Sequence, residues 1–243
     1  MKQILVAGGT GGVGEAIVRA LLGAGHRVIV PSRSEERLER LRRDVERGPG
    51  GRALATLTGE IGTPAGAQAL RDRIAREFGR LDVLVPSLGG WWEGGLLDAT
   101  PDVWDTVMDE MLRTHYVFAH VFVPVLCGQP GGGRYLGIGG GAAYHPIHRS
   151  SLVSIAAAGQ LMLTRALRLE IDNPEVDVLE LVVDGPVRTR DSAHLATPDW
   201  ITSDEVGSIV IELVERGRTE DPATHTSGPI VRMRPRAATE ASR

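Results

Sequence analysis

The chain has 243 residues, of which 42% are hydrophobic, and a formal net charge of −4. This length allows one domain with a substantial core, and the mildly acidic balance argues against nucleic-acid binding, which draws on a basic surface. The single cysteine, Cys127, excludes an internal disulfide and a cysteine-based metal site, and is typical of a reducing cytoplasm. The apolar stretch at the amino terminus, in MKQILVAGG, is too short for a secretory signal, and no run of about 18 uncharged apolar residues predicts a membrane span.

Apolar segments of strand length alternate along the chain with longer segments of helical period. We expect strands at 2–8, 26–32, 52–58, 81–87, 134–140, 176–183 and 228–233. We expect helices at 15–25, 34–47, 63–79, 100–124, 150–167 and 202–215. The strands are almost continuously hydrophobic, as in sheets covered on both faces. The pattern predicts an α/β fold, a single-domain, Rossmann-type, doubly wound parallel sheet of about seven strands flanked by helices. The domain is expected to span 1–234, with a flexible tail at 235–243.

A glycine-rich loop, AGGTGGVG at 7–14, joins the first expected strand to the first helix. Glycine lets the chain turn tightly and lets its backbone approach a diphosphate, while the helix N-terminus offers free N–H groups. We therefore expect a dinucleotide at this loop, the alternative being a turn that binds nothing. The residues assigned to this contact are Gly8, Thr10, Gly11, Gly12, Val13 and Gly14.

The end of the second strand indicates which dinucleotide is bound. An acidic residue there would bind the ribose hydroxyls of NAD, whereas an arginine suits the 2′-phosphate of NADP. Ser32 and Arg33 stand at this position, and the first acids follow on the next helix. This favours NADP(H) over NAD(H), although a solvated arginine is the alternative interpretation.

Together these features resemble the short-chain dehydrogenase/reductase family over essentially the whole chain. The resemblance rests on the glycine loop, TGEI at 58–61, VPSLGG at 85–90, VVDGPVRTR at 182–190 and SGPIVRM at 227–233. It implies NADP(H)-dependent oxidoreductase chemistry. It also implies further cofactor contacts at Glu60, Ile61, Ser87, Gly89, Gly185, Val187 and Thr189.

The family's reaction uses an asparagine, a serine, a tyrosine and a lysine, and this sequence departs from that set. In the register that the resemblance implies, Met111, Gly140, Val153 and Ala157 occupy the four positions. The only lysine is Lys2, and none of the three tyrosines lies within 150–167. The usual proton transfer is therefore expected to be missing.

Other residues near the expected site offer substitutes. Tyr144, His145 and His148 follow the fifth strand and are candidates for a relocated proton donor, the alternative being a polar loop with ordinary histidines. Trp91 and Trp92 are expected either to line a substrate pocket or to plug the space between loop and helix. Ser150 and Ser151 are expected to cap the helix that follows.

Three functions remain open. The first is an NADP(H)-binding member of this family that serves as a sensor, scaffold or inactive subunit. The second is an NADP(H)-dependent oxidoreductase of a carbonyl or alcohol substrate with a proton donor near Tyr144 and His145. The third is a non-redox enzyme on the same fold. We expect no nucleic-acid, membrane or metal partner, and the resemblance implies a homodimer or homotetramer formed through the helices at 100–124 and 150–167.

Overall fold

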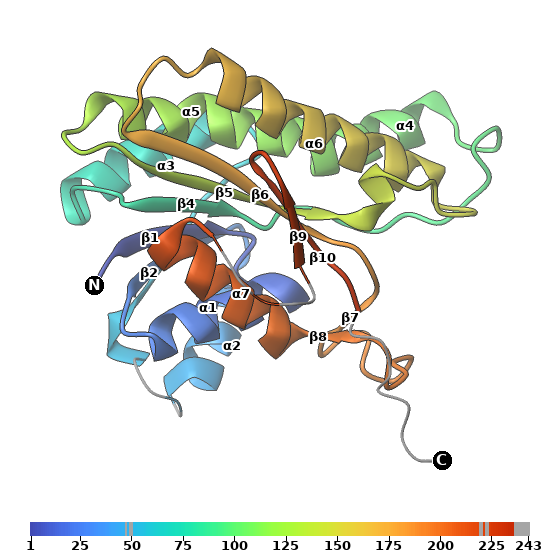
Figure 1. Cartoon of the computed structure of the whole chain (residues 1–243), viewed down its shortest axis with the longest axis horizontal. Coiled ribbons are helices and arrows are strands. Elements are labelled where there is room, and N and C mark those ends of the chain that lie inside the picture. The colour runs from blue at the N-terminus through green and yellow to red at the C-terminus, as the bar shows by residue number, and fades with distance from the viewer. Residues whose placement is uncertain (47, 49–50, 219–220, 222–223, 236–243) are drawn as a thin grey trace.

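The computed structural model describes residues 1–46, 48, 51–218, 221 and 224–235, and it contains one eight-stranded sheet (Figure 1). The strand order is β3-β2-β1-β4-β5-β6-β10-β9, and each neighbouring pair is parallel except β9–β10. These strands are β1 (Gln3–Ala7), β2 (Arg27–Ser32), β3 (Leu54–Thr58), β4 (Val83–Pro86), β5 (Gly133–Gly140), β6 (Val176–Val183), β9 (Thr224–Ser227) and β10 (Ile230–Met233). A separate parallel pair, β7 (Val187–Arg188) and β8 (Ile201–Thr202), lies after β6.

Helices cover both faces of the sheet (Figure 1). One hydrophobic core joins the sheet to α1 (Gly12–Gly23), α2 (Glu35–Glu46) and α7 (Ser203–Arg216). A second core joins the opposite face to α3 (Pro64–Glu77) and α5 (Thr114–Gly128). The remaining helical segments are η1 (Gly51–Ala53), α4 (Pro101–Met108), η2 (Asp109–Arg113), η3 (Gly141–Ala143) and α6 (Ser151–Glu170). The expected doubly wound α/β fold is confirmed.

Local signals account for several helix starts. The Thr63 and Thr100 hydroxyls accept hydrogen bonds from the N–H groups of Gly66 and Val103, at 3.2 and 3.4 Å, with proline next in sequence. At α7, Thr202 and Glu205 cap each other's backbone N–H groups reciprocally. These short polar motifs fix the points at which the chain enters each crossover helix.

The structure differs from the predicted elements at several points, and the two-residue strands β7 and β8 were not predicted. An eighth strand, β9, forms an antiparallel edge, and its short polar sequence THTS carries no hydrophobic period. The helix expected at 100–124 consists of α4, η2 and α5, and continues through Pro124 to Gly128. Residues 47 and 236–243, expected to end one helix and form the tail, lie outside the described residues, whereas Pro235 packs against Gly185.

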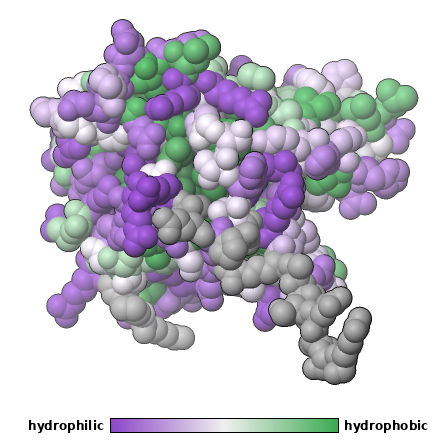
Figure 2. All heavy atoms as spheres, viewed as in Figure 1, coloured by the Kyte–Doolittle hydropathy of each residue, from purple (hydrophilic) through white to green (hydrophobic). Residues whose placement is uncertain are grey.

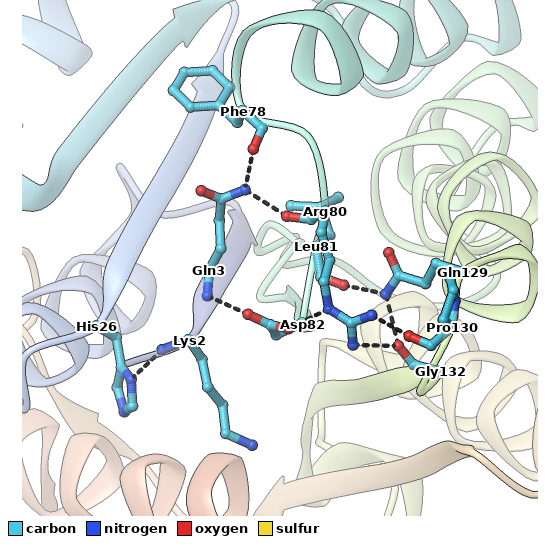
Figure 3. Close-up of polar contacts among 10 residues, drawn as sticks. All are labelled: Lys2, Gln3, His26, Phe78, Arg80, Leu81, Asp82, Gln129, Pro130 and Gly132. Atoms are coloured by element: carbon cyan, nitrogen blue, oxygen red, sulfur yellow. Dashed lines mark hydrogen bonds and ion pairs between the residues drawn. The ribbon is translucent and has the colours of Figure 1, made fainter.

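The amino ends of β1, β4 and β5 are joined by a polar network (Figure 3). The backbone N–H of Gln3 donates to Asp82 at 2.7 Å, and Arg80 pairs with the same carboxylate at 2.8 Å. Lys2 lies at this edge, where its backbone N–H donates to Nδ1 of His26. The five-residue strand β1 separates Lys2 from the glycine loop by roughly 17 Å.

The strand order reverses between β1 and β4, and loops from both strands emerge at the carboxyl edge of the sheet. In open α/β sheets, ligands bind in the crevice at such a reversal. The fold therefore places the glycine loop and the segment after β4 side by side.

Candidate functional site

The glycine loop packs too closely for side chains at two positions. Gly8 has a φ of +81°, and a Cβ there would lie 2.0 Å from the carbonyl oxygen of Ser87. A Cβ on Gly14 would lie 2.2 Å from the carbonyl oxygen of Gly8. The loop closes on itself through the N–H of Gly11, which donates to Gly8 at 3.0 Å. The first helix and the end of β4 consequently meet the loop by backbone contact.

The N-terminus of α1 is left open to a ligand. Its N-cap residue is Gly11, and no side chain caps the first turn. The N–H groups of a first helical turn have no partner within the helix and carry partial positive charge. Thr189 from the segment after β7 lies against Gly12, where a Cβ would come within 2.7 Å of it. These residues fit the diphosphate of a dinucleotide, with Thr189 beside it.

The end of β2 presents a cation. Arg33 is 75% exposed, and its Nε lies 3.7 Å from a carboxylate oxygen of Glu60, whose other oxygen accepts the N–H of Gly62 at 2.7 Å. Glu35, the first acid after Arg33, is hydrogen-bonded to Thr58 and Arg42, and these contacts hold its carboxyl pKa below the ordinary value. Glu35 is engaged toward β3, and Arg33, although paired with Glu60, is the exposed cation at the end of β2.

Two arginines that the sequence analysis missed also contact this region. Arg190 forms ion pairs with buried Glu15 on α1 and, at 3.1 Å, with Asp44 on α2. Arg40 donates to the carbonyl oxygen of Thr10 at 3.3 Å. These contacts tie the segment after β7 and helix α2 to the glycine loop. No local sequence motif predicts these contacts. The Arg190–Glu15 pair, for example, joins residues that are 175 positions apart in the sequence.

The segment after β4 lies over the π-helical stretch η2. Ser87 donates its N–H to Ala7 at 2.8 Å, and a Cβ on Gly89 would lie 3.8 Å from Cε of Met111. His115 is fully buried, with Nε2 3.0 Å from the carbonyl oxygen of Leu88, and burial lowers its pKa to about 4. A neutral His115 therefore holds this segment in place. Single π-turns such as η2 are common near functional sites.

Helix α6 presents no ionisable side chain before Arg165. Val153 and Ala157 lie one turn apart and are 4% and 8% exposed. Apart from Gly140 itself and its chain neighbours, no atom of the described residues lies within 4 Å of the position that a Cβ on Gly140 would take, so this point is open. The expected capping by Ser150 is wrong: Ser150 is the N-cap residue but makes no capping hydrogen bond. Instead, the Ser154 hydroxyl accepts the N–H of Ile147 at 3.0 Å and ties the preceding loop to the helix.

The three proposed substitute donors differ in their surroundings. The ring of Tyr144 lies against Arg232 of β10, with the guanidinium carbon 4.1 Å from the ring centre. Arg232 is held in turn by an ion pair with Asp184 at the end of β6. His145 and His148 are exposed. Of the three candidates, only Tyr144 is fixed by neighbouring side chains that the structure identifies.

The other two tyrosines lie on β5 and α5. Tyr135 is buried in β5, and burial raises its pKa. Tyr116 is exposed on α5 and stacks on His120 with ring centres 5.7 Å apart. Across the described residues, no three His, Cys, Asp or Glu side chains are grouped in a way that would hold a metal ion.

The two tryptophans after β4 take different positions. Trp92 packs against Gly94, and Trp91 is exposed. Further along the chain, Ser192 fixes the end of β7: its hydroxyl accepts the N–H of Thr189 at 2.9 Å and donates to the carbonyl oxygen of Val187 at 2.8 Å. Ile61 is buried in the second core, whereas the neighbouring Glu60 is only partly buried.

Comparisons with known proteins agree with this arrangement. The family model described as short chain dehydrogenase matches residues 2–198. A short chain dehydrogenase/reductase from Macrophomina phaseolina, dpmpG, is 33% identical over 144 residues, covering 58% of this chain and 82% of that protein. Dehydrogenase/reductase SDR family member 4 of Bos taurus is 27% identical over 80% of this chain and 68% of its own length. An alcohol dehydrogenase from the archaeon Thermococcus sibiricus, solved with 5-hydroxy-NADP, superposes with a TM-score of 0.81 at 20% identity, covering 97% of each chain.

Proposed function

This chain belongs to the short-chain dehydrogenase/reductase family, and from that membership we propose that it binds NADP(H) without the family's usual proton transfer. In this proposal the protein acts as a sensor, a scaffold or an inactive subunit. The supporting observation is helix α6, where Val153 and Ala157 are apolar and buried and the first ionisable side chain is Arg165. The sequence contains one lysine, Lys2, which lies at the amino end of β1. It therefore does not reach the first turns of α6, which lie at the carboxyl ends of the strands.

The chain's own residues support the binding half of the proposal. The open first turn of α1 would take the diphosphate, Arg33 would take the 2′-phosphate, and Thr189 would meet the nicotinamide end. A bound nicotinamide would supply hydride-transfer chemistry. The buried apolar side chains of α6 would exclude water beside it without moving a proton. Titrating NADPH fluorescence and then assaying a carbonyl panel tests both halves of the proposal.

Arg33 is expected to set the preference for the phosphorylated cofactor. Replacing Arg33 with alanine should raise the Kd for NADPH about tenfold, since a charge-assisted contact contributes roughly 1.5–3 kcal/mol before solvent screening at this exposed site. The Kd for NADH should stay unchanged, as should both constants in the control Arg76→Ala on α3. Equal losses for both cofactors, or none, would contradict the assignment of Arg33.

A second candidate function is an oxidoreductase with a relocated proton donor. It is favoured by Tyr144, which lies on the loop that follows β5 and whose ring packs against Arg232 of β10. If this function holds, Tyr144→Phe combined with His145→Gln and His148→Gln should abolish NADPH-dependent turnover. Unchanged turnover in the triple variant would remove this candidate. Failure of the wild-type protein to bind NADPH would instead favour a non-redox role.

We further propose a homodimer or homotetramer formed through the helical region α4–η2–α5 and through α6. Ile155, Met162 and Leu169 recur every seven residues along α6 and are exposed, as is Tyr116 on α5. Among the described helices, α6 alone is long and apolar enough to cross a membrane, yet 44% of its apolar window is buried against the rest of the chain. A second copy would cover the exposed stripe.

The free thiol of Cys127 fits a reducing cytoplasm, which we propose as the compartment.

Met162 provides the test of this interface. Replacing it with aspartate should reduce the oligomer to a monomer, because burying an unpaired carboxylate in an apolar contact is strongly unfavourable. Light scattering at micromolar concentration measures the mass directly. The control is Asp72→Asn on α3, which should keep the wild-type mass. A monomeric wild-type protein would contradict the proposal.

A further inference from the structure

Helix α6 is attached to the sheet by a small apolar contact. Among its described residues, Leu167 alone packs against either of the two large cores, and it is half-buried. A third, smaller cluster joins Leu161 of α6 to Val182 of β6 and Ile230 of β10. The other side of α6 lies at the surface, where Figure 2 shows hydrophilic and hydrophobic residues together in the upper part of the molecule. Elements with few buried apolar contacts open locally at the lowest free energy.

The inner face of α6 is otherwise made of small or polar side chains. Beyond Val153, its buried residues include Ala156, Ala157, Gln160 and Thr164. The Gln160 amide donates to the carbonyl oxygen of Ile138 at 3.0 Å. The Thr164 hydroxyl is buried and has no hydrogen-bond partner among the described residues. Burial of this face therefore contributes little hydrophobic free energy to the docking of α6.

An acid lies directly beneath this face. Glu180 of β6 is fully buried, and neither of its carboxylate oxygens has a hydrogen-bond partner in the part of the chain that the structure describes. Two glycines of β5 leave room for it. A Cβ on Gly139 would lie 2.3 Å from Oε1 of Glu180, and a Cβ on Gly137 would lie 3.3 Å from Oγ1 of Thr164. An unpaired buried charge is strongly unfavourable, so this site favours a protonated, neutral carboxyl.

The groups around Glu180 do not neutralise its charge. On β5, burial and Glu180 itself raise the pKa of Tyr135, so this phenol stays neutral. On α6, Arg165 attracts the carboxylate but is exposed and forms no ion pair with it. On β10, the register partner of Glu180 is Ile230, and Arg232 is paired with the acid at the end of β6. An ionised Glu180 can therefore be solvated by water that enters beneath α6.

We propose that a proton on Glu180 locks α6 onto the sheet, and that loss of this proton releases α6 while the two large cores stay folded. The first turns of α6 form the expected nicotinamide floor, and its outer stripe is the proposed contact between copies. Release of α6 would make both of these proposed functions depend on pH. The lock itself concerns the chain without any ligand, so it stands or falls separately from NADPH binding.

The test is amide hydrogen exchange of the full chain, followed by mass spectrometry from pH 5 to pH 8 and converted to an opening constant for each segment. Strand β1 lies in both large cores and reports global unfolding. The opening constant of α6 should exceed that of β1 by at least about tenfold at every pH. It should rise roughly 70-fold from pH 5 to pH 8, because the pKa of Glu180 is about 7 when α6 is docked and 4.5 when the acid is solvated.

The matched variants are Glu180→Gln and Glu170→Gln. The first cannot ionise, so the opening constant of its α6 should not change with pH. The second replaces an exposed acid at the end of the same helix and should behave as the wild type. Glu180→Met, which also lacks a proton to lose, serves if the glutamine variant does not fold.

Three results would overturn the proposed lock. Equal opening constants for α6 and β1 would mean that α6 separates only when the whole chain unfolds. A wild-type α6 whose opening constant does not change with pH would mean that Glu180 does not hold it. The same rise in Glu180→Gln as in the wild type would assign the pH dependence to another group. The comparison of α6 with β1 in the wild type needs no variant, so the proposal is testable even if both replacements of Glu180 unfold the chain.

Discussion

Purified protein is expected to bind NADPH but to reduce ketones and aldehydes with a kcat/KM about 10²–10⁴-fold below that of family members with an intact proton donor. This range corresponds to about 3–5.5 kcal/mol of lost transition-state stabilisation. The physical reason is that Val153 and Ala157 neither donate nor accept a proton, and Gly140 has no side chain to orient a substrate oxygen. Binding is measured by NADPH fluorescence and turnover by the loss of NADPH absorbance.

The binding control follows from the glycine loop. Gly8→Val should abolish the fluorescence change, because its Cβ would lie 2.0 Å from the carbonyl oxygen of Ser87 and its φ is positive. Loss of binding in this variant with a normal circular dichroism spectrum separates a cofactor effect from misfolding. Ketone reduction by the wild-type protein at the rate of intact relatives would contradict the prediction.

A gain-of-function variant makes the same prediction sharper. Gly140→Ser, Val153→Tyr and Ala157→Lys together should raise turnover above that of the wild type. The serine meets open space at Gly140, whereas the two larger side chains must displace their buried surroundings. The matched control, Gly140→Ala with Val153→Phe and Ala157→Met, has similar bulk and no exchangeable proton. Equal rates in both triple variants would show that bulk, and not proton transfer, governs the change.

The sequence predicted the sheet and most helices because hydrophobic period and capping residues act locally. Thr63 and Thr100, each followed by proline, marked two helix starts without knowledge of tertiary contacts. The edge strand β9 was missed because its four residues are polar and its pairing with β10 is the only reason that it is extended. The π-turn at Met111 was missed because its residues have an ordinary helical composition.

The candidate site likewise contains some residues that the sequence could locate and others that it could not. The glycine loop and Arg33 could be located from sequence because strand, loop and helix are consecutive. The ion pair of Arg190 with Glu15 could not, since it depends on how the segment after β7 folds back onto α1. The packing of Tyr144 on Arg232 likewise joins residues far apart in the chain. Sequence spacing predicts contacts within one consecutive strand, loop and helix. Contacts between segments that are far apart in the chain follow only from the tertiary structure.

Replacing Glu180 with glutamine is expected to stabilise the protein at pH 8 by about 3 kcal/mol and to have little effect near pH 5. Glu180 is fully buried on β6 beneath α6, and its carboxyl reaches toward Gly139 of β5. Burial raises its pKa from 4.5 to about 7, an increase that the neighbouring Thr164 and Arg165 of α6 only partly oppose. Each pKa unit corresponds to about 1.4 kcal/mol, which sets the expected size of the effect.

The direction follows from where the proton is held more tightly. The folded state binds the Glu180 proton more strongly than the unfolded state, so this term of the free energy of unfolding is complete below pH 4.5. It declines as the pH rises and is lost above pH 7. His26, whose pKa burial lowers, contributes with the opposite sign, but it titrates equally in both proteins. The difference between wild type and variant at each pH therefore isolates Glu180.

Urea unfolding at a series of pH values from 5 to 9 measures this difference. Because glutamine has nearly the same shape as a protonated glutamic acid, the two proteins should converge in acid and separate through neutrality. A constant difference at all pH values would mean that the carboxyl keeps water or a cation beside it in the folded state. In that case the inner face of α6 near Glu180 would be less dry than its burial indicates.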